Sequence, residues 1–298
     1  MGQTKKLRGH LKSPYAYYLM LPALLVYALL FVLPALSGLL LSFFNVKSFK
    51  LSTITFAGLE NYVTVLRNPY FSIAIKNTLL FAVVTTLGKV IFGMALALLV
   101  NQRFHGVNYM RTVFFLPAVL NNVAVGLVFR SMMHPFGLIN QTLSAMGLDM
   151  LMHNWLTDAK IAIFSCAFVE IWKWTGYTMV IFLAGLQSID KTYYEAAQLD
   201  GATYWQQLRS VTIPLIMPAL NNAVVISVVG GLKVFDIVQS LTNGGPGNAT
   251  SVFGTLIYSS FSSGSYGRGC AASMILTFFV LLIALPTNRF ISRKEVEV

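Results

Sequence analysis

The chain has 298 residues, of which 56% are hydrophobic and only 10% are charged. Apolar runs of roughly 20 residues are long enough to span a bilayer, and the chain contains several, so the composition indicates an integral membrane protein and excludes a soluble domain. The net charge of +11 requires no nucleic-acid partner, because anionic lipid headgroups attract the same basic side chains.

Six apolar runs, separated by polar or Gly/Pro-rich connectors, follow one another along the chain. They are Tyr17–Phe44, Ile75–Val100, Thr112–Met133, Ala159–Leu186, Pro214–Val238 and Ala271–Ile291. Continuous runs favour helices over the strands of a closed barrel, which would show segments of about 10 residues with alternating polarity. We therefore predict an all-α membrane protein with six transmembrane helices.

The first apolar run follows a basic segment that contains Lys5, Lys6, Arg8 and Lys12. Such a segment also begins a signal peptide, but this run is too long for one and has no convincing small-residue cleavage site at its end. We expect a retained first helix. The expected organisation is a basic segment at 1–16, a six-helix transmembrane domain at 17–291 and a C-terminal tail at 292–298.

Basic residues near the helix ends indicate the orientation, because cytoplasmic loops are enriched in Lys and Arg. With the N-terminus inside, the inner segments hold Lys5, Lys6, Arg8, Lys12, Arg103, Arg111, Lys191, Arg209, Arg289, Arg293 and Lys294. The outer segments hold fewer, namely Lys47, Lys50, Arg67, Lys160 and Arg268. We expect both termini and the segment 188–212 to be cytoplasmic, and the loop 134–158 to be external.

The most informative charged residues inside the apolar runs are Lys89 in the second, Glu170 and Lys173 in the fourth, and Lys233 and Asp236 in the fifth. A charge at the bilayer centre costs about 2.5 to 3.5 kcal/mol, so these side chains are expected to face the protein interior. In the fourth run and in the fifth run the two charges stand three residues apart on a helix, where they can neutralise each other. Two interpretations remain open: internal ion pairs that stabilise the bundle, or the lining of a path for a hydrophilic solute.

Aromatic residues lie beside the first of these pairs, at Trp172, Trp174 and Tyr177. Their flat faces can stack on the C–H surfaces of a sugar, whereas anchoring at the membrane interface is less expected more than ten residues inside a run. Amides at membrane depth are Asn121 and Asn122 in the third run and Asn221 and Asn222 in the fifth. These amides are candidates for interhelical hydrogen bonds, and the second pair also for the solute path.

A polar segment between the fourth and fifth runs reads YYEAAQLDGATYWQQL at 193–208. Capping boxes are predicted at Thr192 with Glu195 and at Thr203 with Gln206, where the hydroxyl and the carboxylate or amide satisfy backbone N–H groups at a helix start. Between them stands Gly201, which ends a helix easily in a left-handed conformation. The pattern predicts helix, glycine turn, helix. Capping alone does not distinguish this segment from a helix lying on the lipid headgroups.

The same segment resembles a family signature. Glu195-Ala196-Ala197, Asp200-Gly201-Ala202, Val211, Ile213-Pro214 and Pro218 are similar to the EAA motif of permease subunits of binding-protein-dependent ABC importers. The resemblance implies a type I importer fold and a short coupling helix that docks into a groove of a cytoplasmic ATPase subunit. The coupling residues that it implies are Tyr194, Glu195, Ala196, Ala197, Asp200, Gly201 and Ala202. Leu208 and Ile213 stand where the family often has Phe and Leu.

Further motifs resemble the carbohydrate-importing branch, the subunit type of the larger maltose-transporter permease and its glycerol-phosphate and oligosaccharide relatives. They are FGLINQTL at 136–143 with Trp155-Leu156, FLAGLQSID at 182–190 and KVFDIVQSLTNGGPGNAT at 233–250. The last contains Gly244, Gly245 and Pro246, a predicted tight turn that is either a simple loop or, by the resemblance, an external element facing the binding protein. The resemblance covers about residues 15–291.

No nucleotide-binding loop of the form GxxxxGK[ST] is present, since Gly88-Lys89 lacks both the upstream glycine spacing and a following Ser or Thr. We therefore expect no cofactor on this chain, with ATP and Mg held by a partner ATPase. The resemblance implies four kinds of partner: a second homologous permease, two ATP-binding subunits, an extracytoplasmic solute-binding protein and membrane lipid. It also implies alternating access in the cytoplasmic membrane of a bacterium or archaeon.

Other classes of function find little support in the sequence. His10, His105, His134 and His153 show no paired-ligand spacing, so no metal site is expected. Cys166 and Cys270 are expected to be membrane-buried thiols rather than a disulfide. The alternatives are a self-contained secondary carrier or channel, against which the EAA-like segment argues, and an integral membrane enzyme, for which no catalytic group of residues is found.

Overall fold

The computed structural model describes residues 15–47, 54–102 and 105–293, and within these ranges the chain is mostly helical. The predicted all-α class is therefore confirmed. The helices are α1 (Tyr15–Tyr27), η1 (Ala28–Val32), α2 (Leu33–Leu41), α3 (Glu60–Leu66), α4 (Phe71–Val100), α5 (Val107–Val119), α6 (Asn122–Met132), α7 (Leu138–Ala145), η3 (Asp149–Leu151), α8 (Ala162–Ser188), α9 (Lys191–Leu199), α10 (Tyr204–Gln207), η4 (Leu208–Thr212), α11 (Ile213–Leu215), α12 (Met217–Leu232), α13 (Asp236–Thr242), α14 (Phe253–Ser262) and α15 (Tyr266–Ser292).

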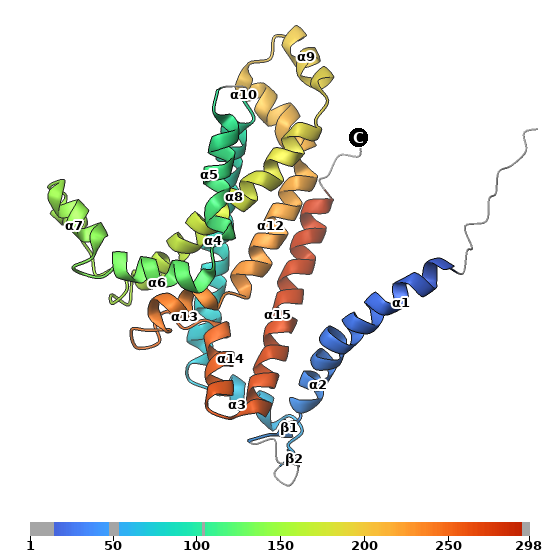
Figure 1. Ribbon diagram of the computed structural model, residues 1–298, viewed down its shortest axis with the longest axis vertical. Helices are drawn as coiled ribbons and strands as arrows, with labels where there is room; N and C mark the ends of the chain where they lie inside the picture. Colours follow the sequence, from blue (N-terminus) through green and yellow to red (C-terminus); the bar gives the residue numbers. More distant parts are fainter. Residues whose placement is uncertain (1–14, 48–53, 103–104, 294–298) are drawn as a thin grey trace, which may run out of the picture.

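Helices α4, α8, α12 and α15 form a central bundle, and the shorter helices lie beside it and at its two ends (Figure 1). Helices α4 and α8 approach closely because Gly88 of α4 faces Ile171 and Gly93 faces Thr178, where a Cβ atom would come within 2.5 Å and 2.9 Å of those side chains. Small residues at helix crossings allow such contacts inside a membrane, where burial of apolar surface drives association only weakly. Buried apolar residues such as Phe81 and Phe182 fill the space between these helices.

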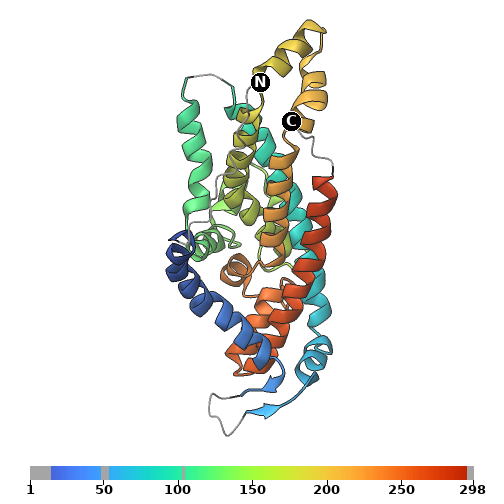
Figure 2. The same ribbon diagram turned by 90° about the vertical axis from the view of Figure 1, so that its right-hand side faces the viewer.

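The N-terminal helical segment α1, η1 and α2 diverges from the bundle (Figures 1 and 2). Its apolar stretch Met20–Leu41 has no buried residue within its most hydrophobic window, and α2 makes the main contact of this segment with α15. The chain then forms a two-stranded antiparallel sheet of β1 (Phe44–Asn45) and β2 (Thr55–Phe56), in which Phe44 pairs with Phe56. The N-terminal helical segment therefore forms a separate arm of the structure.

The predicted third run is not one straight helix. Helices α5 and α6 meet at 96°, with Leu120 in an extended conformation at the bend. Pro117 near the end of α5 weakens the continuation, and the Asn121 side chain accepts hydrogen bonds from the Val123 and Ala124 N–H groups to begin a new helix. The break therefore has a local cause in the sequence.

The predicted fifth run is also interrupted. It bends by 69° between α11 and α12, and α12 ends at Leu232 so that Asp236 begins the separate helix α13. By length and composition, three described helices could each cross a membrane, or five if each bent pair counts as one span. The predicted number of six crossings is therefore not confirmed, although α8 is a continuous helix of 27 residues at the predicted fourth run.

The two ends of the bundle carry different elements (Figure 1). Helices α9 and α10 project at the end toward which α15 finishes, whereas β1, β2, α3 and α14 lie at the opposite end. The predicted N-terminal segment 1–16 and tail 292–298 lie largely outside the described residues. The 188–212 segment and the end of α15 lie at the same end of the bundle (Figure 1).

Candidate functional site

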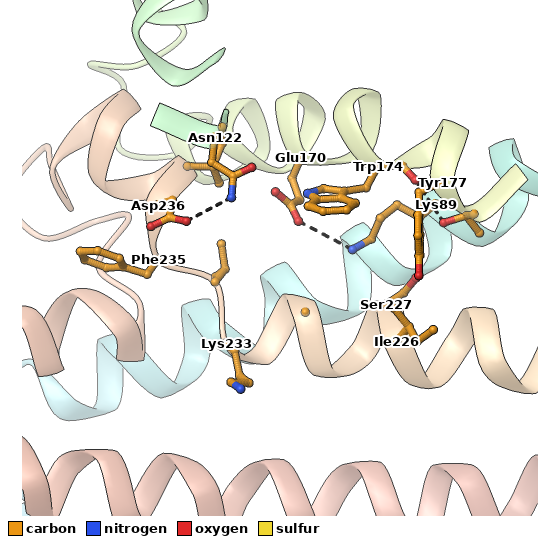
Figure 3. Close-up of a pocket in the computed structure, with 14 residues that line it drawn as sticks. Lys89, Asn122, Glu170, Trp174, Tyr177, Ile226, Ser227, Lys233, Phe235 and Asp236 are labelled. Atoms are coloured by element: carbon orange, nitrogen blue, oxygen red, sulfur yellow. Dashed lines mark hydrogen bonds and ion pairs between the residues drawn. The ribbon is translucent and has the colours of Figure 1, made fainter. Parts of the chain in front are cut away.

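Residues of five helices line a partly open cavity of about 420 Å³ in the bundle (Figure 3). This volume lies within the range of about 300 to 1,000 Å³ that is typical of small-molecule sites. The lining combines charged, amide, hydroxyl and aromatic side chains from α4, α6, α8, α12 and α13. The principal ones are Lys89, Asn122, Glu170, Trp174, Tyr177, Ser227, Lys233, Phe235 and Asp236.

A buried ion pair crosses this cavity between Lys89 of α4 and Glu170 of α8 (Figure 3). The Lys89 Nζ atom lies 3.8 Å from Glu170 Oε1, and both side chains are buried. The predicted partner of Glu170 was Lys173 on the same helix, so this pairing is corrected. An ion pair between two helices neutralises both charges and also ties α4 to α8.

Lys173 is buried away from the cavity lining and serves the bend between α5 and α6. Its Nζ atom donates a hydrogen bond to the Ala118 carbonyl at 3.2 Å and lies 4.4 Å from the centre of the Trp174 ring. Ala118 stands in the last turn of α5, where carbonyl groups lack intrahelical partners and carry partial negative charge. The bend leaves the Ala118 carbonyl without an intrahelical partner inside the membrane-spanning region, and the Lys173 ammonium supplies a hydrogen bond to it.

The predicted pair of Lys233 and Asp236 does not form. The break between α12 and α13 separates the two residues, and their side chains point apart in Figure 3. Asp236 instead accepts a hydrogen bond of 3.0 Å from the Asn122 side chain of α6. Three-residue spacing produces a pair only on a continuous helix, and the chain is not helical at this point.

The aromatic residues of α8 divide between two faces of the helix. Trp174 and Tyr177 line the cavity, and their rings meet edge to face with centroids 5.9 Å apart. Trp172 is partly exposed and packs against Phe129 of α6 at 5.1 Å instead. Positions two apart on a helix face different directions, so only one of the two tryptophans can line the cavity.

The amides also separate. Asn221 is buried on α12 and donates a hydrogen bond of 2.9 Å to Asn288 of α15, whereas Asn222 is exposed. Of the predicted solute-path residues, the structure gathers Glu170, Trp174, Tyr177, Lys233 and Asp236 around one cavity and places Trp172, Lys173, Asn221 and Asn222 elsewhere. Asn122 and Phe235 were not named from the sequence as lining residues, and Lys89 was named only among the costly intramembrane charges.

A second functional element is the coupling segment, defined here as residues 190–208. Helix α9 begins at Lys191, with Asp190 rather than the predicted Thr192 as its N-cap. Hydrogen bonds from the Thr192 hydroxyl and backbone N–H hold the pKa of Asp190 below its ordinary value. Both residue types cap helices well, and the extended conformation at Asp190 decides between them.

The predicted glycine turn and second capping box are confirmed. Gly201 has a φ of 76°, the Ala202 N–H donates to the Ala197 carbonyl at 2.9 Å, and the Gly201 N–H donates to the Gln198 carbonyl at 3.0 Å. These two bonds form a Schellman motif that closes α9. Thr203 and Gln206 then form the box that starts α10, with the Thr203 N–H donating to Gln206 Oε1 at 2.7 Å.

The coupling segment presents large apolar side chains to the surroundings. Leu199 is 90% exposed and Trp205 is 75% exposed, on either side of the glycine turn, and Glu195 and Ala196 are exposed as well. A single side-chain hydrogen bond of 3.1 Å, between the hydroxyls of Tyr194 and Thr212, joins α9 to η4. An exposed apolar surface of this kind is typical of a protein contact.

The Gly244-Gly245-Pro246 sequence forms a tight turn after α13, as predicted. Gly244 has a φ of 81°, and its carbonyl accepts a hydrogen bond of 3.2 Å from the Thr250 N–H. The Asn77 side chain of α4 donates to the Ala249 and Ser251 carbonyls at 2.8 Å and 3.0 Å. The loop is therefore fastened to the bundle at the end opposite the coupling segment (Figure 1).

Known proteins resemble this chain over nearly its whole length. The family described as "Binding-protein-dependent transport system inner membrane component" matches residues 89–293. A probable ABC transporter permease protein, YurN of Bacillus subtilis, is 35% identical over 92% of this chain and 94% of its own. The trehalose/maltose transport system permease protein MalF of Thermococcus litoralis is 33% identical over 96% of this chain and 97% of its own.

A solved structure of an ABC transporter also contains a chain that is similar to this one. A bacterial alginate ABC transporter in complex with an alginate pentasaccharide-bound periplasmic protein contains a chain that is 28% identical to this one. The two superpose with a TM-score of 0.80, over 95% of this chain and 96% of that one. The arrangement of α4, α8, α12 and α15 is thus shared with a transporter subunit.

Proposed function

This chain belongs to the family of binding-protein-dependent transport system inner membrane components, and from that premise we propose that it forms part of the path by which an ABC importer takes up a carbohydrate. It is a transport permease subunit and not an enzyme. The substrate class, the coupling partners and the membrane orientation are the proposed parts.

The observation that carries the carbohydrate proposal is the central cavity. Trp174 and Tyr177 present ring surfaces on which sugar C–H groups stack, and Ser227 and Asn122 add groups that hydrogen-bond to hydroxyls. Lysines and carboxylates line the cavity in equal number, so the lining favours a neutral hydrophilic solute. Relatives named for trehalose/maltose transport and, in Rhizobium radiobacter, for lactose transport support the same class.

The partners that we propose follow from the family description and from the exposed coupling segment. A second homologous permease completes the path, an extracytoplasmic binding protein delivers the solute, and two ATP-binding subunits hold ATP and Mg. The segment from Tyr194 to Ala202 docks on one of these subunits and transmits its closure to α12 through η4 and α11. Alternating access then results from tilting of the bundle helices around the cavity.

The proposed orientation places the coupling segment and both termini in the cytoplasm and the loop 134–158 outside, in the inner membrane of a bacterium or archaeon. Single-cysteine labelling of intact cells with an impermeant maleimide tests it, because Gln198 and Asp149 are both exposed. We expect Asp149→Cys to be labelled and Gln198→Cys to be labelled only after the cells are permeabilised. The reverse pattern would place the coupling segment outside and refute the orientation.

The solute path is tested by comparing the two tryptophans of α8. Trp174→Ala removes a ring from the cavity wall, and we expect uptake of radiolabelled maltose, trehalose or lactose by the reconstituted complex to fall about tenfold or more, as for a buried aromatic contact. Trp172→Ala is the matched control, since Trp172 packs on Phe129 outside the cavity. Assembly with the ATPase should survive in both. Equal losses of uptake in the two variants would argue against the cavity as the path.

A further inference from the structure

A second cavity, of about 450 Å³, lies at the end of the bundle opposite the coupling segment. Its lining comes from the turn between α3 and α4, from α13, from the loop 243–251 and from α14. Figure 1 shows where these helices lie. We call this cavity the outer cavity. It was not predicted from the sequence, because its lining comes from four separate parts of the chain.

The chemistry of the outer cavity differs from that of the central one. Amides from Asn68, Gln239, Asn243 and Asn248 face it together with serine, threonine and tyrosine hydroxyls, and among the described residues that line it none is charged. Each amide offers two donors and one acceptor, and each hydroxyl offers both. An ion would lose its hydration there without gaining a countercharge, whereas a neutral molecule rich in hydroxyl groups would find matching partners.

The two asparagines of the loop are held in a less common conformation. Asn243 and Asn248 have φ values of 53° and 67°, in the left-handed region. Gln239 donates to Asn243 Oδ1, and the Ser251 hydroxyl donates to Asn248 Oδ1 at 3.2 Å. These bonds engage both Oδ1 atoms and leave the two Nδ2 groups without a hydrogen-bond partner within the described residues. The Nδ2 groups of Asn243 and Asn248 can therefore donate hydrogen bonds to a ligand in the cavity.

The outer and central cavities meet at an aromatic pair. Tyr258 of α14 lines the outer cavity, and its ring centroid lies 5.2 Å from that of Phe235, which lines the central cavity at the break between α12 and α13. A solute that enters the outer cavity thus stands one side-chain layer from the central one. Aromatic faces on both sides of this layer suit a sugar ring at each position.

We propose that the outer cavity is a second binding site for a neutral oligosaccharide, occupied before the central cavity, with the Phe235 and Tyr258 pair dividing the two. This inference rests on the proposed carbohydrate uptake and adds a site to it. The outer site binds through uncharged amides and hydroxyls and through the Tyr258 ring, and the Phe235 and Tyr258 rings must separate for the sugar to advance.

Cysteine protection tests the site in the reconstituted complex. Ser259 lines the outer cavity, and Ser260, its neighbour on α14, does not. A polar methanethiosulfonate reagent is applied to Ser259→Cys and Ser260→Cys with and without the sugar that is taken up fastest among maltose, trehalose and lactose. The natural Cys166 and Cys270 are buried, and the unsubstituted complex gives their background. We expect sugar to slow the labelling of Ser259→Cys several-fold and to leave Ser260→Cys unchanged.

A second variant addresses recognition by the amide. Asn243→Gly removes the side chain but keeps the left-handed backbone, so the loop should retain its shape. Loss of hydrogen bonds from one amide should raise the sugar concentration needed to protect Ser259→Cys by about tenfold. Unchanged labelling at Ser259→Cys, equal slowing at both cysteines, or an unshifted concentration in the Asn243→Gly background would overturn the outer site. Absence of uptake of every sugar by the unsubstituted complex would instead refute the proposed function.

Discussion

Replacing Gly201 by valine is expected to abolish solute uptake while leaving the protein in the membrane. Gly201 holds a φ of 76°, and a Cβ atom added there would meet nothing within 4 Å. The effect would therefore come from the backbone alone: a left-handed conformation costs an ordinary residue about 1 to 2 kcal/mol, and more for a β-branched one. The two backbone hydrogen bonds of the Schellman motif form only while residue 201 is left-handed, so this strain would also weaken the end of α9.

The measurements are uptake, ATPase activity stimulated by the binding protein, and co-purification of the ATPase, each on the reconstituted complex. We expect all three to fall strongly for Gly201→Val. Gly201→Asn is the matched control, because asparagine tolerates the left-handed region, and it should keep most of the activity. If Gly201→Val has unchanged uptake and coupling, the segment is a surface loop and its proposed role is wrong.

Reversing the charge of Glu195 tests the contact with the ATPase without changing the backbone of the coupling segment. Glu195 is exposed in the middle of α9 and makes no ion pair within the described residues. Glu195→Lys should therefore leave the fold of the coupling segment intact and still reduce uptake, by reversing the charge offered to the ATPase. Retained co-purification with reduced uptake would distinguish it from Gly201→Val. Full uptake in Glu195→Lys would show that Glu195 does not contribute to the proposed contact with the ATPase.

The coupling segment was predictable because its structure is local. Gly201 and the box of Thr203 and Gln206 are determined by residues within a few positions of each other, and the structure has both. The cap of α9 was misplaced by two residues, because Asp190 and Thr192 are both good caps and nothing in the local sequence chooses between them. The choice depends on where α8 ends, which is a property of the whole loop.

The central cavity was only partly predictable. The sequence marked Glu170, Lys233 and Asp236 as costly charges, but their partners come from helices that are distant in the chain: Lys89 for Glu170, and Asn122 for Asp236. Periodicity assigns a face to a residue only while the helix is continuous. The bend before α6 and the break before α13 remove that continuity, and both breaks place residues in the cavity wall.

The other large expected effect concerns the ion pair of Lys89 and Glu170. Glu170→Ala would leave the Lys89 ammonium buried without its carboxylate, and breaking a buried pair from one side costs about 3 to 5 kcal/mol. We expect a strongly lowered thermal stability of the purified subunit and a reduced yield of assembled complex. Thermal unfolding in detergent and the amount of co-purified ATPase would measure both. Near-normal stability of Glu170→Ala would show that the pair contributes nothing to the bundle.

The double replacement Lys89→Met with Glu170→Met removes both charges together and supplies the control. An apolar pair of similar length is often as stable as a buried ion pair, so the double variant should recover most of the stability that Glu170→Ala loses. Uptake per assembled complex then shows whether the pair of Lys89 and Glu170 only stabilises the bundle or also lines the solute path. A stable double variant with normal uptake would assign the pair to the stability of the bundle. Because both residues line the central cavity, we expect instead a stable complex whose uptake remains low.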